Sequence, residues 1–177
     1  TNVVYSTYLD VLVEFVRWLL VHDYDVRLVI GDSADLPVVQ EFKSLLKQRS
    51  VTHEEGRVID EPVGSVDDLL KQLGATDLVV ATRFHNVLLS LVLDKPVLAI
   101  SFHHKCSSLM RQMGLSEYCQ DINYINAQEL IEQFCDLEKN AERLRPLIKQ
   151  KTVAFRKALD NQYAEILNKI SNSASSS

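Results

Sequence analysis

Apolar residues recur along the chain with two different periods, and these periods divide it into alternating helices and strands. Spacings of three and four residues between Tyr8 and Leu19 predict a long amphipathic helix that ends near His22 and Asp23. A continuous apolar run at 26–30, closed by Gly31, is typical of a buried strand. Further helices are expected at about 36–46, 65–73, 86–93 and 106–113, and further strands at 57–59, 77–82, 96–100 and 118–122.

The last third of the chain is helical in pattern. Asn126 and Glu129 have the spacing of a capping box, which predicts a helix start. A long charged helix is expected from about 140 to 170, with a place to break at Pro146, and the serine-rich segment 171–177 is expected to be a disordered tail. Because strands alternate with helices, we expect one α/β domain over 1–170. It should be Rossmann-like, a parallel sheet of about five strands with helices on both faces.

Composition narrows the class of protein. The 177 residues are 46% hydrophobic and 24% charged, and the net charge of −5 disfavours a nucleic-acid surface, which needs a concentrated basic face. Cys106, Cys119 and Cys135 form no C-x-x-C pair and are interpreted as buried thiols in a reducing compartment. The apolar runs are too short or too interrupted to span a bilayer. We therefore expect a cytoplasmic protein, which could also work at the inner face of the membrane. The chain starts at Thr1 without Met, which suggests a piece of a longer protein.

Candidate chemistry lies in the turns that follow strands, because ligands of open parallel sheets bind beyond the carboxyl ends of the strands. Three turns qualify, at 31–33, 82–86 and 101–107. In the first, Asp32 could orient a hydroxyl or a cation, although an Asp in this position more often closes the turn between strand and helix. The sequence contains no dinucleotide-binding, P-loop or serine-hydrolase signature.

The turn at 82–86 combines three features of an anion site. Arg83 offers a planar fork that grips carboxylate or phosphate with two bonds. The helix that starts near Asn86 adds free N–H groups and a partial positive charge, and His85 can exchange a proton near neutral pH. The alternative is that Arg83 pairs with an acidic neighbour and His85 is only a helix-start residue. The pattern leaves both interpretations open.

The turn at 101–107 places Lys105, a compact cation suited to phosphate, at another helix start. His103 and His104 are each more typical of exposed loop residues. Adjacent histidines do not easily chelate one metal ion, and no third ligand is suitably spaced. We therefore expect no metal site.

Two of these turns carry a resemblance to a known family. Residues 77–85 (DLVVATRFH), 95–105 (KPVLAISFHHK) and 113–115 (MGL) resemble the polysaccharide pyruvyl transferases, most closely the colanic-acid-type bacterial members. Such proteins show Arg-[Phe/Leu]-His after a strand, then Gly-x-Pro, then an aromatic-x-x-Lys turn. The likeness is strong over about 65–121 and is elsewhere limited to the order of elements. Here Asp94 replaces the Gly, and Phe102 stands where Tyr is usual, so any role of a phenol is lost.

The resemblance implies a GT-B-like architecture of two Rossmann-type domains. This chain would be the C-terminal, donor-binding half, inactive without the missing N-terminal domain. The implied enzyme uses phosphoenolpyruvate, with no cofactor, to form a pyruvate ketal on a sugar or lipid-linked oligosaccharide during exopolysaccharide biosynthesis. Arg83, Phe84 and His85 match the donor-binding motif.

Within that motif we expect His85 to be the general acid and base, with His104 as a weaker second candidate. Arg83 and Lys105 would hold the carboxylate and the phosphate of the donor, helped by N–H groups of the Asn86 helix. Two alternatives stay open. One is a GT-B glycosyltransferase that uses a nucleotide sugar, although its usual pair of Glu with seven residues between them is absent. The other is a non-catalytic binding module of the same fold.

Overall fold

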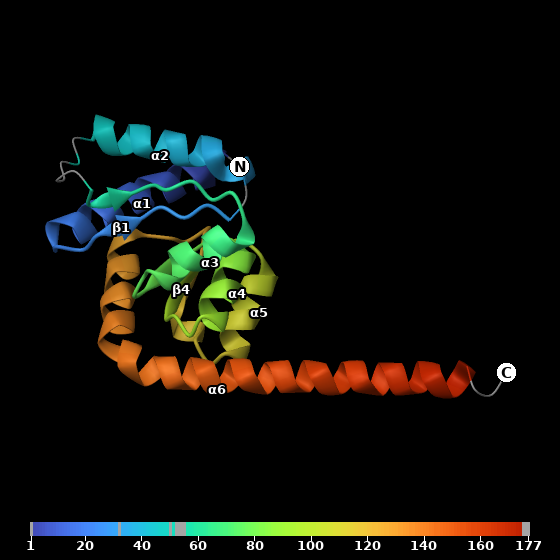
Figure 1. Cartoon of the computed structure of the whole chain (residues 1–177). Helices are drawn as coiled ribbons and strands as arrows, with labels where there is room; N and C mark the ends of the chain where they lie inside the picture. Colours follow the sequence, from blue (N-terminus) through green and yellow to red (C-terminus); the bar gives the residue numbers. More distant parts are fainter. Residues whose placement is uncertain (1, 32, 50, 52–55, 175–177) are drawn as a thin grey trace.

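Helices and strands alternate along the chain as expected (Figure 1). The computed structural model describes residues 2–31, 33–49, 51 and 56–174, and Asp32, considered above as an orienting residue, lies outside them. The strands are β1 (Val26–Arg27), β2 (Val58–Ile59), β3 (Val79–Ala81), β4 (Val97–Ser101) and β5 (Cys119–Asp121). The helices are α1 (Asn2–Val21), α2 (Leu36–Gln48), α3 (Val66–Gly74), α4 (Phe84–Val92), α5 (His104–Gln112) and α6 (Ala127–Ala174), with 3-10 turns η1 (Ser33–Asp35) and η2 (Ser116–Tyr118). In this part of the chain, no helix is long and apolar enough to cross a bilayer.

The five described strands run parallel, which confirms an α/β fold of the Rossmann-like kind. They form two ladders, one of β1 and β2 and one in the order β3-β4-β5. The expected single sheet of about five strands is therefore two separate ladders, and the break between them lies between β1 and β3. A cavity of about 650 Å³ lies at the division, with Arg27 and Val29 on one side and Val80 and Thr82 on the other. Strands that pair lie only about 5 Å apart, whereas β1 and β3 are not paired across this space.

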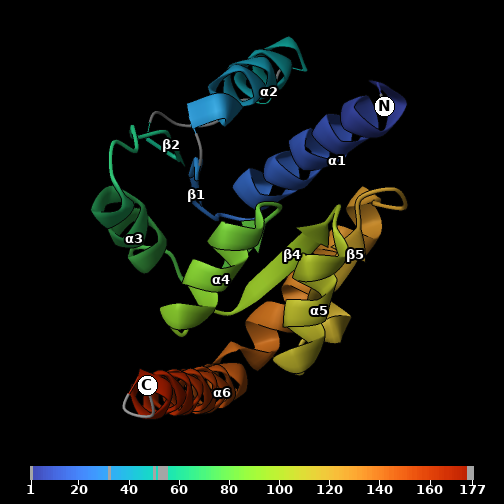
Figure 2. The ribbon, with the colours of Figure 1, turned by 90° about the vertical axis from the view of Figure 1, so that its right-hand side faces the viewer.

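Helices cover both faces of the three-stranded ladder. Figure 2 shows α5 in front of β4 and β5, and the first part of α6 behind them. The central strand β4 is buried along its whole length, and Val97, Leu98, Ala99 and Ile100 are 0% exposed. A continuous apolar run in a central parallel strand is the pattern that this double coverage requires.

Local signals in the sequence explain where several helices begin and end. Ser65 caps α3, because its hydroxyl accepts a hydrogen bond from the N–H of Asp68 at 3.1 Å. The carboxylate of Asp68 accepts in return from the Ser65 hydroxyl at 2.8 Å, which lowers the pKa of Asp68. The expected capping box is therefore present. At the other end of the chain, Asn126 caps α6 by accepting from the N–H of Glu129 at 2.8 Å.

The C-terminal region forms one helix, α6, where a helix from Asn126 and a second charged helix had been expected. Pro146 lies inside α6 and does not end it. Figure 1 shows the helix change direction along its course, and a proline causes such a bend because it removes a hydrogen bond to the preceding turn. The backbone of 171–174 is the last turn of α6, and the rest of the expected disordered tail lies outside the described residues.

The three cysteines are free thiols in different environments. Cys106 is buried, Cys119 is half-buried, and Cys135 is exposed on α6. The prediction of buried thiols therefore holds for Cys106, holds only in part for Cys119 and is wrong for Cys135. The composition of the chain could not reveal this, because it does not show on which face of a helix a single residue lies.

Candidate functional site

Two of the three candidate turns meet at one edge of the β3-β4-β5 ladder. β3 ends at Ala81 and β4 at Ser101, and the parallel register pairs Ala81 with Ala99. The turns that follow lead directly into α4 and α5, whose first residues are Phe84 and His104. The fold therefore brings together two helix N-termini, each with N–H groups that have no acceptor inside the helix.

A cavity of about 270 Å³ lies between these two turns. It contains three of the residues expected to form the site, namely Phe84, His85 and Lys105. Its other lining residues are Thr82, Phe102, His103 and Cys106. We call this cavity the motif pocket.

The cationic and titratable side chains of the motif pocket are accessible. His85 and Lys105 are both exposed. Within the part of the chain that the structure describes, neither side chain has a hydrogen bond or an ion pair, and the His85 ring lies edge-on to Phe84 with 5.6 Å between ring centroids. An ammonium and an imidazole without internal partners are available to an anionic ligand.

Arg83 is the N-cap residue of α4, and its side chain does not line the motif pocket. Its Nε donates to Oδ2 of Asp35 at 2.9 Å, and its Nη2 donates to Oδ1 of the same carboxylate. This is the alternative left open above, in which Arg83 pairs with an acidic neighbour. Asp35 lies at the end of η1, directly before α2.

Asn86 is buried inside the first turn of α4 and does not reach the motif pocket with its side chain. Its Oδ1 has no hydrogen-bond partner among the described residues. The amide lies against Gly31, where a Cβ atom would come within 2.3 Å of Oδ1. The contribution of Asn86 to an anion site is therefore limited to its backbone N–H, and its side chain packs against Gly31 after β1.

The two adjacent histidines have different roles. His103 is the N-cap of α5, and its Nδ1 accepts from the N–H of Lys105 at 3.3 Å. His104 is exposed and does not line the motif pocket, and its ring lies 4.3 Å from that of His103. His103, which the sequence pattern had treated as a loop residue, thus lies closer to the site than His104. No cluster of metal-ligating residues exists in the described ranges.

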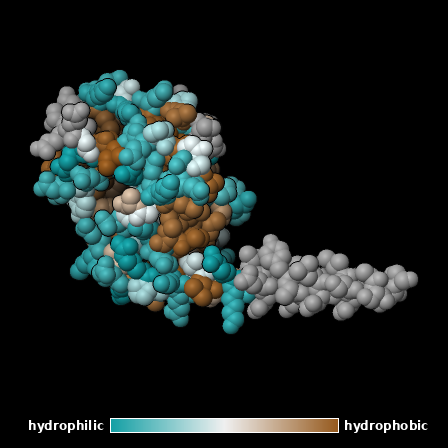
Figure 3. Space-filling view, viewed as in Figure 1, coloured by the Kyte–Doolittle hydropathy of each residue, from teal (hydrophilic) through white to brown (hydrophobic). Residues whose placement is uncertain are grey.

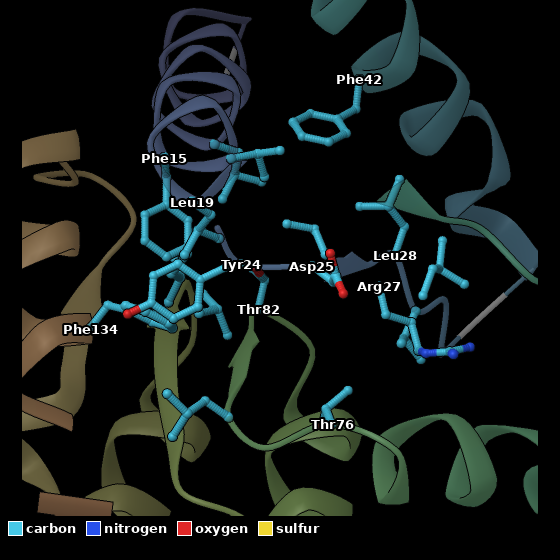
Figure 4. A pocket seen from close by; sticks show the side chains of 18 of the residues that line it. Phe15, Leu19, Tyr24, Asp25, Arg27, Leu28, Phe42, Thr76, Thr82 and Phe134 are labelled. Atoms are coloured by element: carbon cyan, nitrogen blue, oxygen red, sulfur yellow. The ribbon is translucent and has the colours of Figure 1, made fainter. Parts of the chain in front are cut away.

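Thr82 connects the motif pocket with the larger cavity between the two ladders, because it lines both. Its Oγ1 lies 2.8 Å from the hydroxyl of Tyr8, whose pKa is raised mainly by burial. Figure 4 shows this larger cavity, with the rings of Phe15, Tyr24 and Phe134 on one side.

The geometry defines an α/β domain with an open, cationic pocket at the carboxyl edge of a parallel sheet. Sequence comparison then places the chain among known proteins. The profile of the family described as polysaccharide pyruvyl transferase matches residues 2–104, and the chain belongs to this family. The match begins far upstream of the region where the likeness had been strongest, and it ends one residue before Lys105.

One sequence relative supports the same family. The amylovoran biosynthesis protein AmsJ of Erwinia amylovora is 26% identical over 99 residues, which are 55% of this chain and 24% of that protein. The matched segment thus spans about a quarter of the length of this curated relative. No solved structure matches the chain. Both matches concern polysaccharides by name, since the family is described as polysaccharide pyruvyl transferase and the relative as an amylovoran biosynthesis protein.

Proposed function

We propose that the chain is the donor-binding domain of a pyruvyl transferase that uses phosphoenolpyruvate to form a pyruvate ketal on a sugar. The observation that carries the proposal is the presence of Lys105 and His85 in one pocket between the N-termini of α4 and α5. Phosphoenolpyruvate carries a carboxylate and a phosphate. Two helix N-termini and a free ammonium form a surface that stabilises a ligand with these two anionic groups.

Arg83 would complete the donor site by releasing the carboxylate of Asp35 and binding the carboxylate or phosphate of the donor. Its guanidinium now binds the carboxylate of Asp35 through two donors, which is the geometry that a donor carboxylate or phosphate would adopt. The side chains of Arg83 and Asp35 are 44% and 22% exposed, so the ion pair is screened by solvent. Donor binding would therefore require Arg83 to turn from Asp35 towards the motif pocket.

His85 is the candidate acid and base for the reaction. Ketal formation adds two sugar oxygens to C2 of the donor, adds a proton to its methylene carbon and releases phosphate. Both sugar hydroxyls lose their protons. One proton completes the new methyl group, and the other protonates the departing phosphate. An exposed imidazole in the wall of the motif pocket is suited to these transfers. His104, outside that wall, remains the weaker candidate.

The remaining components of the proposed enzyme lie outside this chain. The acceptor would be a sugar or a lipid-linked oligosaccharide, held largely by an N-terminal domain of the same protein. Under this proposal the domain alone is inactive, no organic cofactor takes part, and the reaction takes place in the cytoplasm, where the donor is made.

Thermal-shift titration of the full-length protein tests the donor. Phosphoenolpyruvate should raise Tm more than inorganic phosphate at equal concentration, because it adds a second anionic group; at a hundredfold excess over Kd the stabilisation is about 2.7 kcal/mol. Stabilisation by a nucleotide sugar and not by phosphoenolpyruvate would favour a glycosyltransferase. A protein that no donor stabilises would instead be a non-catalytic module.

A further inference from the structure

Thr82 is the residue through which the wall of the motif pocket contacts helix α1. It directly follows Ala81, the last residue of β3, and its half-buried side chain has Oγ1 2.8 Å from the hydroxyl oxygen of Tyr8. Tyr8 lies 74 residues earlier in the sequence. We call these two side chains the hydroxyl pair. The proposed reaction has given neither of them a role, although one of them lines the pocket in which the donor would bind.

The chemistry of the two hydroxyls favours one direction for the hydrogen bond between them. The ordinary pKa of a tyrosine hydroxyl is about 10, far below that of an aliphatic alcohol, so the phenol is the better donor and the threonine oxygen the better acceptor. Burial raises the pKa of Tyr8, and the phenol therefore keeps its proton at neutral pH. Among the residues that the structure describes, neither hydroxyl has another hydrogen-bond partner. When Tyr8 donates, the proton of Thr82 is left for a ligand.

The polar groups that a ligand could meet beside α4 are concentrated at its N-terminal turn. Beyond this turn the surface over α4 is hydrophobic, with Leu88 and Val92 36% and 41% exposed (Figure 3). An anion in the motif pocket would therefore be bound by side chains of the two turns, namely Thr82, His85 and Lys105. A hydroxyl that accepts one hydrogen bond becomes a stronger donor of another, so the contact with the phenol suits Thr82 to this position.

We propose that the Thr82 hydroxyl donates a hydrogen bond to an anionic oxygen of the donor, and that Tyr8 is the positioning residue that orients it. The inference rests on the donor site proposed above. Tyr8 donates to Oγ1 of Thr82, and the one proton of Thr82 then points away from the phenol and towards the motif pocket. Tyr8 acts on the donor only through Thr82.

A double-mutant cycle on the full-length protein tests this coupling, with affinity for phosphoenolpyruvate measured by isothermal titration calorimetry. Thr82→Val removes the hydroxyl and keeps the branched shape, and it should weaken binding about tenfold, the usual effect of losing a hydrogen bond to a charged group. Tyr8→Phe should weaken binding about threefold, as expected for a neutral hydrogen bond. In the Thr82→Val background, Tyr8→Phe should have no further effect, because the group that it orients is absent.

Two further variants distinguish positioning from a general effect on the fold. Thr82→Ser keeps the hydroxyl, and it should bind the donor almost as tightly as the wild type and remain sensitive to Tyr8→Phe. Tyr5→Phe removes another phenol from α1, which donates to Glu41 at 2.8 Å and lines neither cavity, and it should leave donor affinity unchanged. Thermal unfolding checks that every variant folds. Equal losses from Tyr8→Phe in both backgrounds would show that Tyr8 acts on the fold, and would overturn the inference.

The outcomes also separate this inference from the proposed donor. Unchanged affinity of the Thr82→Val variant for phosphoenolpyruvate would overturn the role of the hydroxyl pair and leave the donor in place. If the wild type binds inorganic phosphate and not phosphoenolpyruvate, the proposed donor is wrong, and the same cycle with inorganic phosphate tests the hydroxyl pair by itself. A wild type that binds neither anion would overturn both.

Discussion

Arg83 and Asp35 lie 48 residues apart in the sequence and are joined by two hydrogen bonds from one guanidinium to one carboxylate. Their contact links the turn after β3 with the turn before α2, and so connects the two ladders at their carboxyl edges. It also occupies the side chain that we propose binds the donor. The first two predictions separate these two roles.

Arg83→Ala should weaken binding of phosphoenolpyruvate by about 1.5–3 kcal/mol, the usual contribution of a hydrogen bond to a charged group. Isothermal titration calorimetry on the full-length protein measures the change. Arg49→Ala is a matched control, because Arg49 is also 44% exposed and paired with a carboxylate, that of Asp10. Equal donor affinity in the Arg83 variant and the wild type would remove Arg83 from the donor site.

Asp35→Asn should strengthen donor binding by about two- to fivefold, because the donor no longer has to displace a partner from an ion pair of up to about 1 kcal/mol. The same titration detects this change. Glu41→Gln removes a carboxylate from the same segment without touching Arg83, since Glu41 accepts from the Tyr5 hydroxyl at 2.8 Å. Weaker donor binding in the Asp35 variant would mean that Asp35 positions Arg83 and does not compete for it.

His85→Ala should lower kcat by about a hundredfold or more, with a smaller effect on donor affinity, because proton transfer acts on the transition state. Steady-state kinetics with a purified acceptor gives both quantities. His22→Ala is the control for replacing an exposed histidine outside the motif pocket, since His22 lies at the end of α1 and bonds the carbonyl of Trp18. Near-normal turnover of the His85 variant would contradict the assignment.

Tyr24 should make the stability of the domain sensitive to alkaline pH. Its hydroxyl donates to Glu138 of α6 at 2.7 Å, and this bond, helped by burial, raises its pKa from 10.0 to about 12. A raised pKa contributes stability below the unfolded value of 10.0, and this contribution is lost as pH rises through about 12. Urea unfolding of wild type and Tyr24→Phe should therefore converge between these pH values. Tyr124→Phe, at an exposed side chain, should show no such convergence.

The sequence predicted the elements better than it predicted their contacts. Periodicity and caps located α3, β4 and the two turns of the motif, because those signals depend on neighbours in the chain. The position of Lys105 beside His85 followed from the rule that parallel strands end at one edge. The partner of Arg83 did not follow, since any of 24 acidic residues could have served and only the packing of η1 selects Asp35.

Two further differences between the predicted and the observed structure also arise from features that the local sequence pattern does not record. The division between β1 and β3 is a relation between distant segments, and no periodicity within either strand records it. The cavity at the division is also lined by Phe15 of α1 and Phe134 of α6. His103 looked like a loop residue because its capping function depends on backbone angles, φ −145° and ψ 138°, that composition does not encode. Contacts between distant segments were therefore the limit of the prediction.

The division of the sheet also bears on how the domain opens. In the described part of the chain, no backbone hydrogen bond joins β1 or β2 to the β3-β4-β5 ladder. The contact between Arg83, after β3, and Asp35, before α2, is made by side chains. Separation of the two layers would therefore break no ladder. Cooperative units of local unfolding follow such boundaries, so amide hydrogens of β1 and β2 should exchange with solvent at a lower free energy than those of β4. The motif pocket lies on the more protected side of that boundary, and Arg83 is bound across it.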